Sequence, residues 1–219
     1  MEMSAGIALQ MHANMWTEED MGMKLKTRDM ILVGIFTALT AIGAFIQIPI
    51  PVVPFTLQNL FCAFSGVFLG ARLGLYSQLL YVGIGLSGIP IFTKGGGISY
   101  VFQPTFGYLI GFIFCAYIIG YFTQNLQKVN FKNVFLPIIL GMMVIYAIGV
   151  PYMYCILRYY LVQPITFITA LKLGFFPFIL QDIFLSILIA WTATKVIPSL
   201  RKAGYLSGSS KIDIGIEKQ

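Results

Sequence analysis

Charged residues are scarce in this sequence. Asp, Glu, Lys and Arg together make up 10% of the 219 residues, whereas hydrophobic residues make up 58%. A soluble domain of this length needs far more polar surface, so the composition excludes an ordinary soluble globular protein and indicates a membrane protein. Because a transmembrane helix takes about 20 apolar residues, the length allows roughly five to seven spans. No room is left for a second folded domain.

Groups that carry catalytic or metal chemistry are equally scarce. The single histidine is His12, close to the N-terminus, and the three cysteines each lie inside an apolar run. Cysteine in such a run usually behaves as a small hydrophobic residue. The sequence contains no paired-carboxylate motif, no Cys/His cluster and no GxxxxGK(S/T) phosphate-binding loop. We therefore expect no enzyme activity, no bound metal and no cofactor.

Composition divides the chain into three regions. Residues 1–22 are polar and acidic and lack the basic start and apolar centre of a signal peptide, so we interpret them as an added leader or a disordered extension. Residues 23–202 are predicted to form a single six-helix membrane domain. Residues 203–219 are polar and contain glycines and serines, which predicts a flexible cytoplasmic tail.

Six apolar stretches are predicted to cross the membrane as helices, which gives an all-α polytopic fold. They cover residues 29–47, 55–71, 73–91, 104–122, 134–157 and 175–197. The proline cluster IPIPVVP at 48–54 ends the first span and predicts an ordered external loop, because proline cannot continue a helix. The stretch 158–174 is too polar to cross, and we expect a short surface helix there.

The basic residues predict the orientation of these spans. All 14 lie outside the spans or at their ends, and 11 of them become cytoplasmic if the N-terminus is inside. Cytoplasmic loops of membrane proteins carry an excess of Lys and Arg, so this distribution favours an even number of spans with both termini in the cytoplasm. It also explains the net charge of +6 without a nucleic-acid partner.

Three basic residues, Lys94, Arg158 and Lys172, fall on the external side instead. They come from separate loops, and if these loops converge at one external mouth, the three cations would favour an anionic ligand. Alternatively, each anchors the chain at the lipid headgroups, with its charge in the interface.

Asp182 is the only acidic residue between Asp29 and Asp213, and it lies in the sixth predicted span. A carboxylate inside a membrane costs about 2.5–3.5 kcal/mol on insertion scales, so it needs a partner or a wet cavity. Asp182 is therefore expected either to contact a ligand or to form a structural ion pair with Lys172 or Arg158.

Other polar residues gather on the same external half of the spans. They are Thr56, Gln58, Ser99, Tyr100, Gln103 and Thr105. Together they are predicted to line a pocket. The triple glycine Gly95, Gly96 and Gly97 offers backbone N–H groups to a ligand, although it also fits a flexible connector.

Small residues share one face of the first span. Gly34, Ala38 and Ala41 are spaced i, i+4 and i+7, which lets another helix approach closely. That helix belongs either to a partner protein or to this chain.

Three motifs, taken in order, resemble the BioY family. They are PVVPFTLQ at 51–58, FLGARLGLYSQLLYVGIGLSGIPIF at 68–92 and KGGGISYVFQPTFGYLIGF at 94–112. BioY proteins are the biotin-specific, substrate-binding S components of energy-coupling factor (ECF) transporters. The resemblance covers residues 24–202 and implies a multi-pass protein of the bacterial plasma membrane with the S-component fold. It also implies biotin capture from outside and delivery with a transmembrane T component and two cytoplasmic ABC ATPases, which alone would use ATP.

The resemblance also implies roles for particular residues. Small residues of the first helix dock onto the T component in this family, and Gly34, Ala38 and Ala41 match them, with a glycine in place of one alanine. Relatives often carry a lysine three residues after the aspartate of the last helix, where this chain has Leu185. A charge partner for Asp182 must then come from elsewhere.

The two ends of biotin need different anchors. Asp182 or Gln103 is expected to accept hydrogen bonds from the ureido N–H groups, and Thr56 and Gln58 are further partners for this head. One of the external cations, assisted by the backbone N–H groups of the triple glycine, is expected to meet the valerate carboxylate. Two alternatives stay open: an S component for another vitamin, and a stand-alone channel or carrier for a small solute.

Overall fold

The computed structural model describes residues 26–50, 52–126 and 129–202. The predicted leader 1–22 and tail 203–219 lie outside the described residues. The described residues divide between Ile31 and Leu32 into two compact units. All contacts that bear on the site lie within the second unit.

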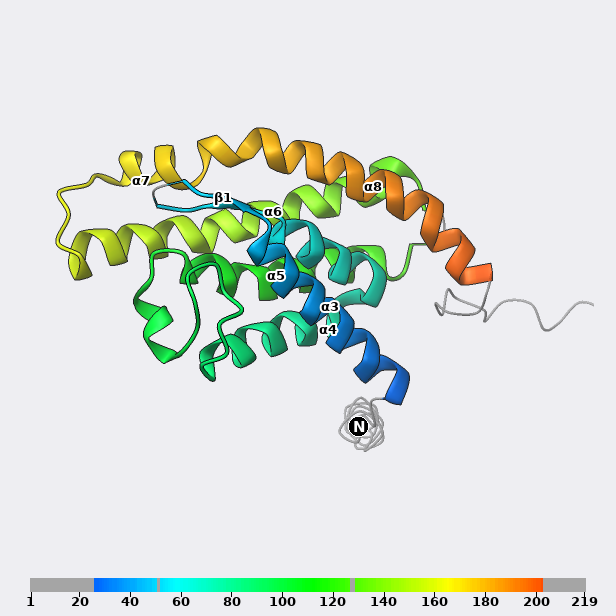
Figure 1. The fold of residues 1–219 in the computed structure, drawn as a ribbon. Helices are drawn as coiled ribbons and strands as arrows, with labels where there is room; N and C mark the ends of the chain where they lie inside the picture. Colours follow the sequence, from blue (N-terminus) through cyan, green and yellow to red (C-terminus); the bar gives the residue numbers. More distant parts are fainter. Residues whose placement is uncertain (1–25, 51, 127–128, 203–219) are drawn as a thin grey trace, which may run out of the picture. The chain divides into compact units, whose positions relative to one another are not determined.

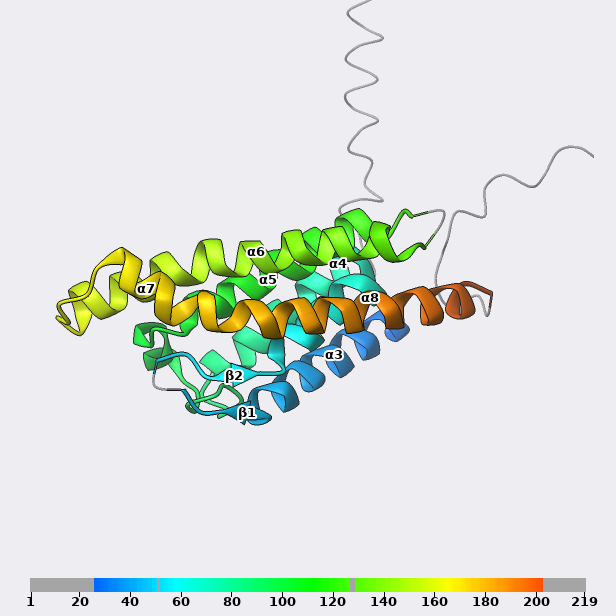
Figure 2. The same cartoon turned by 90° about the horizontal axis from the view of Figure 1, so that it is seen from above.

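The described chain is mainly helical (Figure 1 and Figure 2). The long helices are α3 (Thr27–Phe45), α4 (Gln58–Leu86), α5 (Phe106–Thr123), α6 (Phe131–Cys155) and α8 (Ile179–Lys202). The short elements are strands β1 (Gln47–Ile48) and β2 (Phe55–Thr56), the 3-10 helices η2 (Ile98–Phe102) and η4 (Phe176–Phe178), the π-helix η3 (Ile156–Tyr160) and helix α7 (Phe167–Gly174). Five helical stretches, each containing one long helix, are long and apolar enough to cross a membrane.

α4 consists of two antiparallel helical segments. Gly70 interrupts it with φ 79° and ψ −176°, a conformation that residues with a side chain rarely adopt. Gln58 Nε2 donates to the Tyr81 hydroxyl at 2.6 Å, although 23 residues would span about 34 Å in a straight helix. Figure 1 shows the reversal in the cyan to blue-green part of the ribbon. With α4 counted twice, the five apolar stretches become six helical segments, which correspond to the six predicted spans.

α5 packs against α4 and α6, and α6 packs against α8. Close approach between α5 and both segments of α4 depends on residues without bulk. A Cβ atom on Gly66 would lie 2.6 Å from the Ala116 carbonyl oxygen, and one on Gly120 would lie 2.3 Å from the Ala71 nitrogen. Small residues at such contacts are typical of helices that pack within a membrane.

Polar side chains join α3 to α4. The Thr37 hydroxyl donates to the Ser77 carbonyl at 2.9 Å, and Gln78 Nε2 donates to the Thr40 and Ser65 hydroxyls, each at 3.2 Å. All five side chains are buried. Interhelical hydrogen bonds are important in a bilayer because lipid is as apolar as the helices, so apolar burial gives little drive for association.

The observed boundaries differ from the predicted spans chiefly on the predicted external side. Strands β1 and β2 pair antiparallel at residues that were mostly predicted to be helical, since Gln47 was assigned to the first span and Phe55 and Thr56 to the second. α4 therefore begins at Gln58 rather than at residue 55. α4 ends at Leu86 rather than at 91, because Gly88 with φ 109° and Pro90 follow. η4 precedes α8, which therefore begins at Ile179 rather than at 175. α7 confirms the short helix predicted within 158–174.

Candidate ligand-binding site

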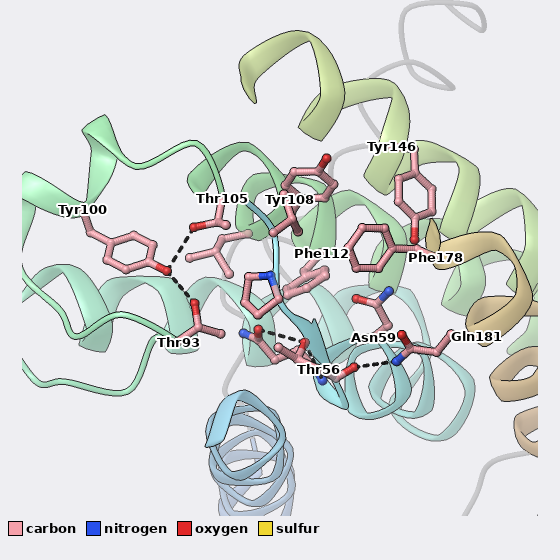
Figure 3. A pocket seen from close by; sticks show the side chains of 14 residues that line it. Thr56, Asn59, Thr93, Tyr100, Thr105, Tyr108, Phe112, Tyr146, Phe178 and Gln181 are labelled. Carbon is pink, nitrogen blue, oxygen red and sulfur yellow. Dashed lines mark hydrogen bonds between the residues drawn. The ribbon is translucent and has the colours of Figure 1, made fainter. Parts of the chain in front are cut away.

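A cavity lies among α4, α5, α6, α8 and the loops beside them (Figure 3). It is lined by Val53, Pro54, Thr56, Gln58, Asn59, Thr93, Tyr100, Thr105, Tyr108, Leu109, Phe112, Tyr146, Phe178 and Gln181. Apolar and aromatic walls with a few convergent polar groups are typical of small-molecule sites. The cavity volume is about 40 Å³. Ligand pockets usually measure roughly 300–1,000 Å³, so a vitamin-sized ligand requires these walls to move apart.

Asp182 lies in the first turn of α8, directly behind the cavity-lining residues Asn59 and Tyr146. Its Oδ1 accepts a hydrogen bond from Asn59 Nδ2 at 3.0 Å, and its Oδ2 accepts one from the Tyr146 hydroxyl. Only 5% of Asp182 is exposed. Within the described chain, neutral donors that line the cavity thus hold this carboxylate, and the alternative of an ion pair with Lys172 or Arg158 is not found. The positive end of the α8 dipole also favours a carboxylate here.

Thr56 and Gln58 line the cavity, as the sequence predicts. The Thr56 hydroxyl donates to Gln58 Oε1 at 3.2 Å, and Gln58 Nε2 donates to the Tyr81 hydroxyl. The Tyr81 hydroxyl in turn donates to the Ile91 carbonyl at 3.1 Å. Residues from the first two motifs of the sequence therefore hold each other in place at one wall of the cavity.

Tyr100 is shared between this cavity and a second, outer pocket. The outer pocket has a volume of about 320 Å³ and is lined by Lys94, Gly96, Ser99, Tyr100, Phe102, Gln103, Pro104, Tyr160 and Leu161. The Tyr100 hydroxyl lies 2.9 Å from the Thr93 hydroxyl and 3.1 Å from the Thr105 hydroxyl. Figure 3 shows these two contacts as dashed lines. Tyr100 thus lines both pockets, Thr105 lines the inner cavity, and Ser99 and Gln103 line the outer pocket.

The three external cations do not gather around these two pockets. Lys94 lines the outer pocket, whereas Arg158 in η3 and Lys172 in α7 are exposed and line neither pocket. The prediction that all three converge at one mouth is therefore not supported by the described residues.

The triple glycine forms an ordered turn rather than a flexible connector. Gly95 and Gly97 have φ values of 109° and 100°, which suit glycine. Their N–H groups donate to the carbonyls of Phe92 at 3.2 Å and Gly85 at 2.7 Å. These two N–H groups are therefore already used, and Gly96 alone lines the outer pocket.

Sequence reasoning missed Asn59, Tyr146 and Gln181, which surround Asp182. Asn59 directly follows the PFTLQ segment, and Gln181 directly precedes Asp182, so a search of the neighbouring polar residues finds both. Tyr146 has no such local signal. It reaches the site because α6 packs against α8.

The small-residue face of α3 is open in the described chain at two of its three positions. Gly34 and Ala38 are exposed, and Ala41 is half-buried. A Cβ atom added to Gly34 would meet nothing within 4 Å. Packing among the described residues therefore does not occupy the face at Gly34 and Ala38.

Comparison with known proteins identifies the family from the sequence and the fold from the structure. The sequence model of the BioY family matches residues 17–202. A probable biotin transporter BioY of Lysinibacillus sphaericus is 45% identical over 177 residues, which cover 81% of this chain and 90% of the relative. The biotin transporter BioY of Thermotoga maritima is 37% identical over 170 residues, which cover 77% of this chain and 95% of the relative.

The fold is similar to the crystal structure of the S component for biotin from an ECF-type ABC transporter. The TM-score is 0.68 at 24% identity, with 78% of this chain and 91% of the other covered. This likeness and the apolar helices show a multi-pass membrane protein with the S-component fold. The chain belongs to the BioY family.

Proposed function

We propose that this chain is the biotin-binding S component of an ECF transporter, which captures biotin at the outer face of the plasma membrane. The observation that carries this proposal is the aromatic cavity backed by Asp182, whose carboxylate, among the described residues, is held by the neutral donors Asn59 and Tyr146. A carboxylate that already has two neutral donors still has lone pairs for the N–H groups of a ligand. The ureido ring of biotin carries two such groups. Membership of a family whose relatives are named biotin transporters supports the same ligand.

The arrangement of the two pockets supports one orientation of biotin. A carboxylate beside Asp182 would bring two negative charges together, and the residues that the structure places around the inner cavity include no cation. Lys94 lines the outer pocket on the far side of Tyr100. We therefore place the ureido ring in the inner cavity and the valerate carboxylate near Lys94. Gln103, which also lines the outer pocket, then lies closer to the tail than to the ureido ring.

Aromatic burial must supply a large part of the affinity. The four methylenes of the valerate contribute only about 3 kcal/mol, at about 0.8 kcal/mol each. Nanomolar capture requires about 12 kcal/mol. Tyr108, Phe112 and Phe178 line the inner cavity and are the surfaces against which the fused rings would be buried.

We also propose that the chain works with a T component and two cytoplasmic ATPases, which hydrolyse ATP in its place. The sequence has no phosphate-binding loop of its own. The exposed Gly34 and Ala38 of α3 offer the close approach that a docking helix of the T component needs.

Calorimetric titration of the detergent-purified protein with biotin tests the ligand. We expect stoichiometric binding of biotin, weaker binding of biotin methyl ester because the ester loses its charge near Lys94, and no binding of thiamine or riboflavin. Failure of biotin to bind to folded protein contradicts the proposal. Binding of another vitamin instead would identify an S component for that vitamin, and uptake that is independent of T component and ATPases would identify a carrier.

A further inference from the structure

Gln181 precedes Asp182, and the two polar atoms of its carboxamide differ in their contacts. Nε2 donates to the Thr56 carbonyl at 3.0 Å. Oε1 is buried and has no hydrogen-bond partner in the described part of the chain. A carbonyl can only accept, so the amide nitrogen must face Thr56, and the oxygen is fixed on the other side. Figure 3 shows this oxygen on the side of Asn59, with the nitrogen directed at Thr56.

A buried acceptor without a donor is unfavourable, and native structures usually provide it with a partner. Gln181 lines the inner cavity, so a ligand in that cavity is such a partner. We propose that Gln181 is a specificity-determining residue, whose Oε1 accepts one N–H group of a cyclic urea in the ligand. This inference rests on the proposed function, in which the ureido ring of biotin occupies the inner cavity.

The chemistry of the neighbours favours an amide at this position. Asp182 already places one negative charge behind the wall, and a neutral amide oxygen accepts an N–H group without adding a second charge. Gln181 is also anchored through Nε2 to the backbone of β2, so its oxygen does not need to be ordered when the ligand binds. Movement of the walls to admit the ligand would open a path to this oxygen, which has almost no accessible surface in the present form.

A set of variants and ligand analogues distinguishes the role of Gln181 Oε1 as a hydrogen-bond acceptor for the ligand from the role of Gln181 Nε2 as an anchor to Thr56. Gln181→Met removes both the acceptor oxygen and the donor to Thr56, whereas Gln181→Glu removes the donor and keeps an acceptor. The ligands are biotin and its two derivatives methylated at one or the other ureido nitrogen. Gln124→Met is the matched control, because Gln124 Oε1 accepts the Ala71 N–H at 3.1 Å and Gln124 lines neither pocket. Thermal unfolding verifies that each variant is folded.

In the wild type we expect one of the two methylated derivatives to bind about tenfold to a hundredfold more weakly than biotin, because it leaves Oε1 unpaired. In Gln181→Met, biotin should weaken by a similar factor, and the difference between biotin and that derivative should disappear. In Gln181→Glu the difference should persist, and in Gln124→Met all affinities should stay as in the wild type.

An equal loss of affinity for all three ligands in Gln181→Met would show that Gln181 acts only as an anchor of β2, and it would overturn the inference. Unchanged biotin affinity in this variant would overturn it as well. Either result leaves the proposed function intact, because the wild type still binds biotin. Absence of biotin binding to the wild type would instead refute the proposed function, and the role of Gln181 with it.

Discussion

At the scale of residues, the site depends on what stabilises a buried carboxylate within an apolar membrane domain. Asp182 is buried, and an amide and a phenol donate to it in place of a cation. Such donors stabilise the negative charge of the carboxylate without neutralising it as a cation would. The carboxylate can therefore still attract N–H groups of a ligand. A lysine at position 185, three residues after Asp182, would compete with the ligand for the oxygens of the carboxylate. The leucine found three residues later, Leu185, is buried and leaves Asp182 to its neutral partners.

Replacement of Asp182 by asparagine tests this interpretation. The variant keeps the shape but loses the charge, and hydrogen bonds to charged groups contribute about 1.5–3 kcal/mol. We therefore expect the dissociation constant for biotin to rise by about 10- to 100-fold in a calorimetric titration.

Asp29→Asn is the control for this titration, because Asp29 also lies in the first turn of a long apolar helix, α3. It should bind biotin as the wild type does. Unaltered affinity in Asp182→Asn would show that the carboxylate has only a structural role.

At the scale of elements, the hairpin within α4 brings polar residues from distant parts of the chain to one wall. Gln58 and Tyr81 meet because the helix reverses at Gly70. A Cβ atom at Gly70 would lie 3.0 Å from Gln124 Oε1, in addition to the unfavourable φ of 79°. The geometry of the cavity wall thus depends on a single glycine at the far end of the hairpin.

Gly70→Ala should therefore destabilise the folded protein. Residues held in such a backbone conformation cost about 1–3 kcal/mol each, so we expect a clearly lower Tm in thermal unfolding of the purified protein. The matched control is Gly83→Ala in the second segment of α4, where an added Cβ atom would meet nothing within 4 Å.

Because alanine favours a helix by about 0.5–1 kcal/mol over glycine, the control should keep or raise the Tm. Equal Tm values for Gly70→Ala and the wild type would contradict the assigned role of the turn.

At the scale of the whole molecule, binding and docking use different surfaces. The inner cavity is built from α4, α5, α6, α8 and the adjoining loops. The small residues Gly34 and Ala38 lie on the exposed face of α3, whose other side is bonded to α4 through Thr37 and Thr40. This separation allows the two functions to be tested independently.

Ala38→Trp should abolish most of the uptake and leave binding intact. A bulky ring at a contact made for small residues prevents close approach of a partner helix. We expect the rate of ATP-dependent biotin uptake, measured in vesicles with T component and ATPases, to fall about tenfold or more, with unchanged biotin affinity.

Leu180→Trp on α8, where the native side chain is 79% exposed, is the control for bulk on a lipid-facing surface and should transport normally. Normal uptake by Ala38→Trp would exclude this face as the docking surface.

Hydropathy and local chain chemistry alone determined the class of protein, the helical segments and the tight turn between the second and third of them. These properties depend on residues close together in sequence, as in Gly70-Ala71-Arg72, where glycine permits the reversal. The pairing of β1 with β2 escaped prediction because each strand is only two residues long.

Only the tertiary structure decided what surrounds Asp182. Asn59 is 123 residues away in sequence and Tyr146 is 36 residues away, so their contacts depend on how three helices are rotated and packed. The same packing left Arg158 and Lys172 outside both pockets and buried the Gln181 oxygen at the cavity wall. Sequence determined which polar groups the membrane domain contains, whereas helix packing determined which of them face one another, because side-chain direction depends on helix rotation as well as on sequence spacing.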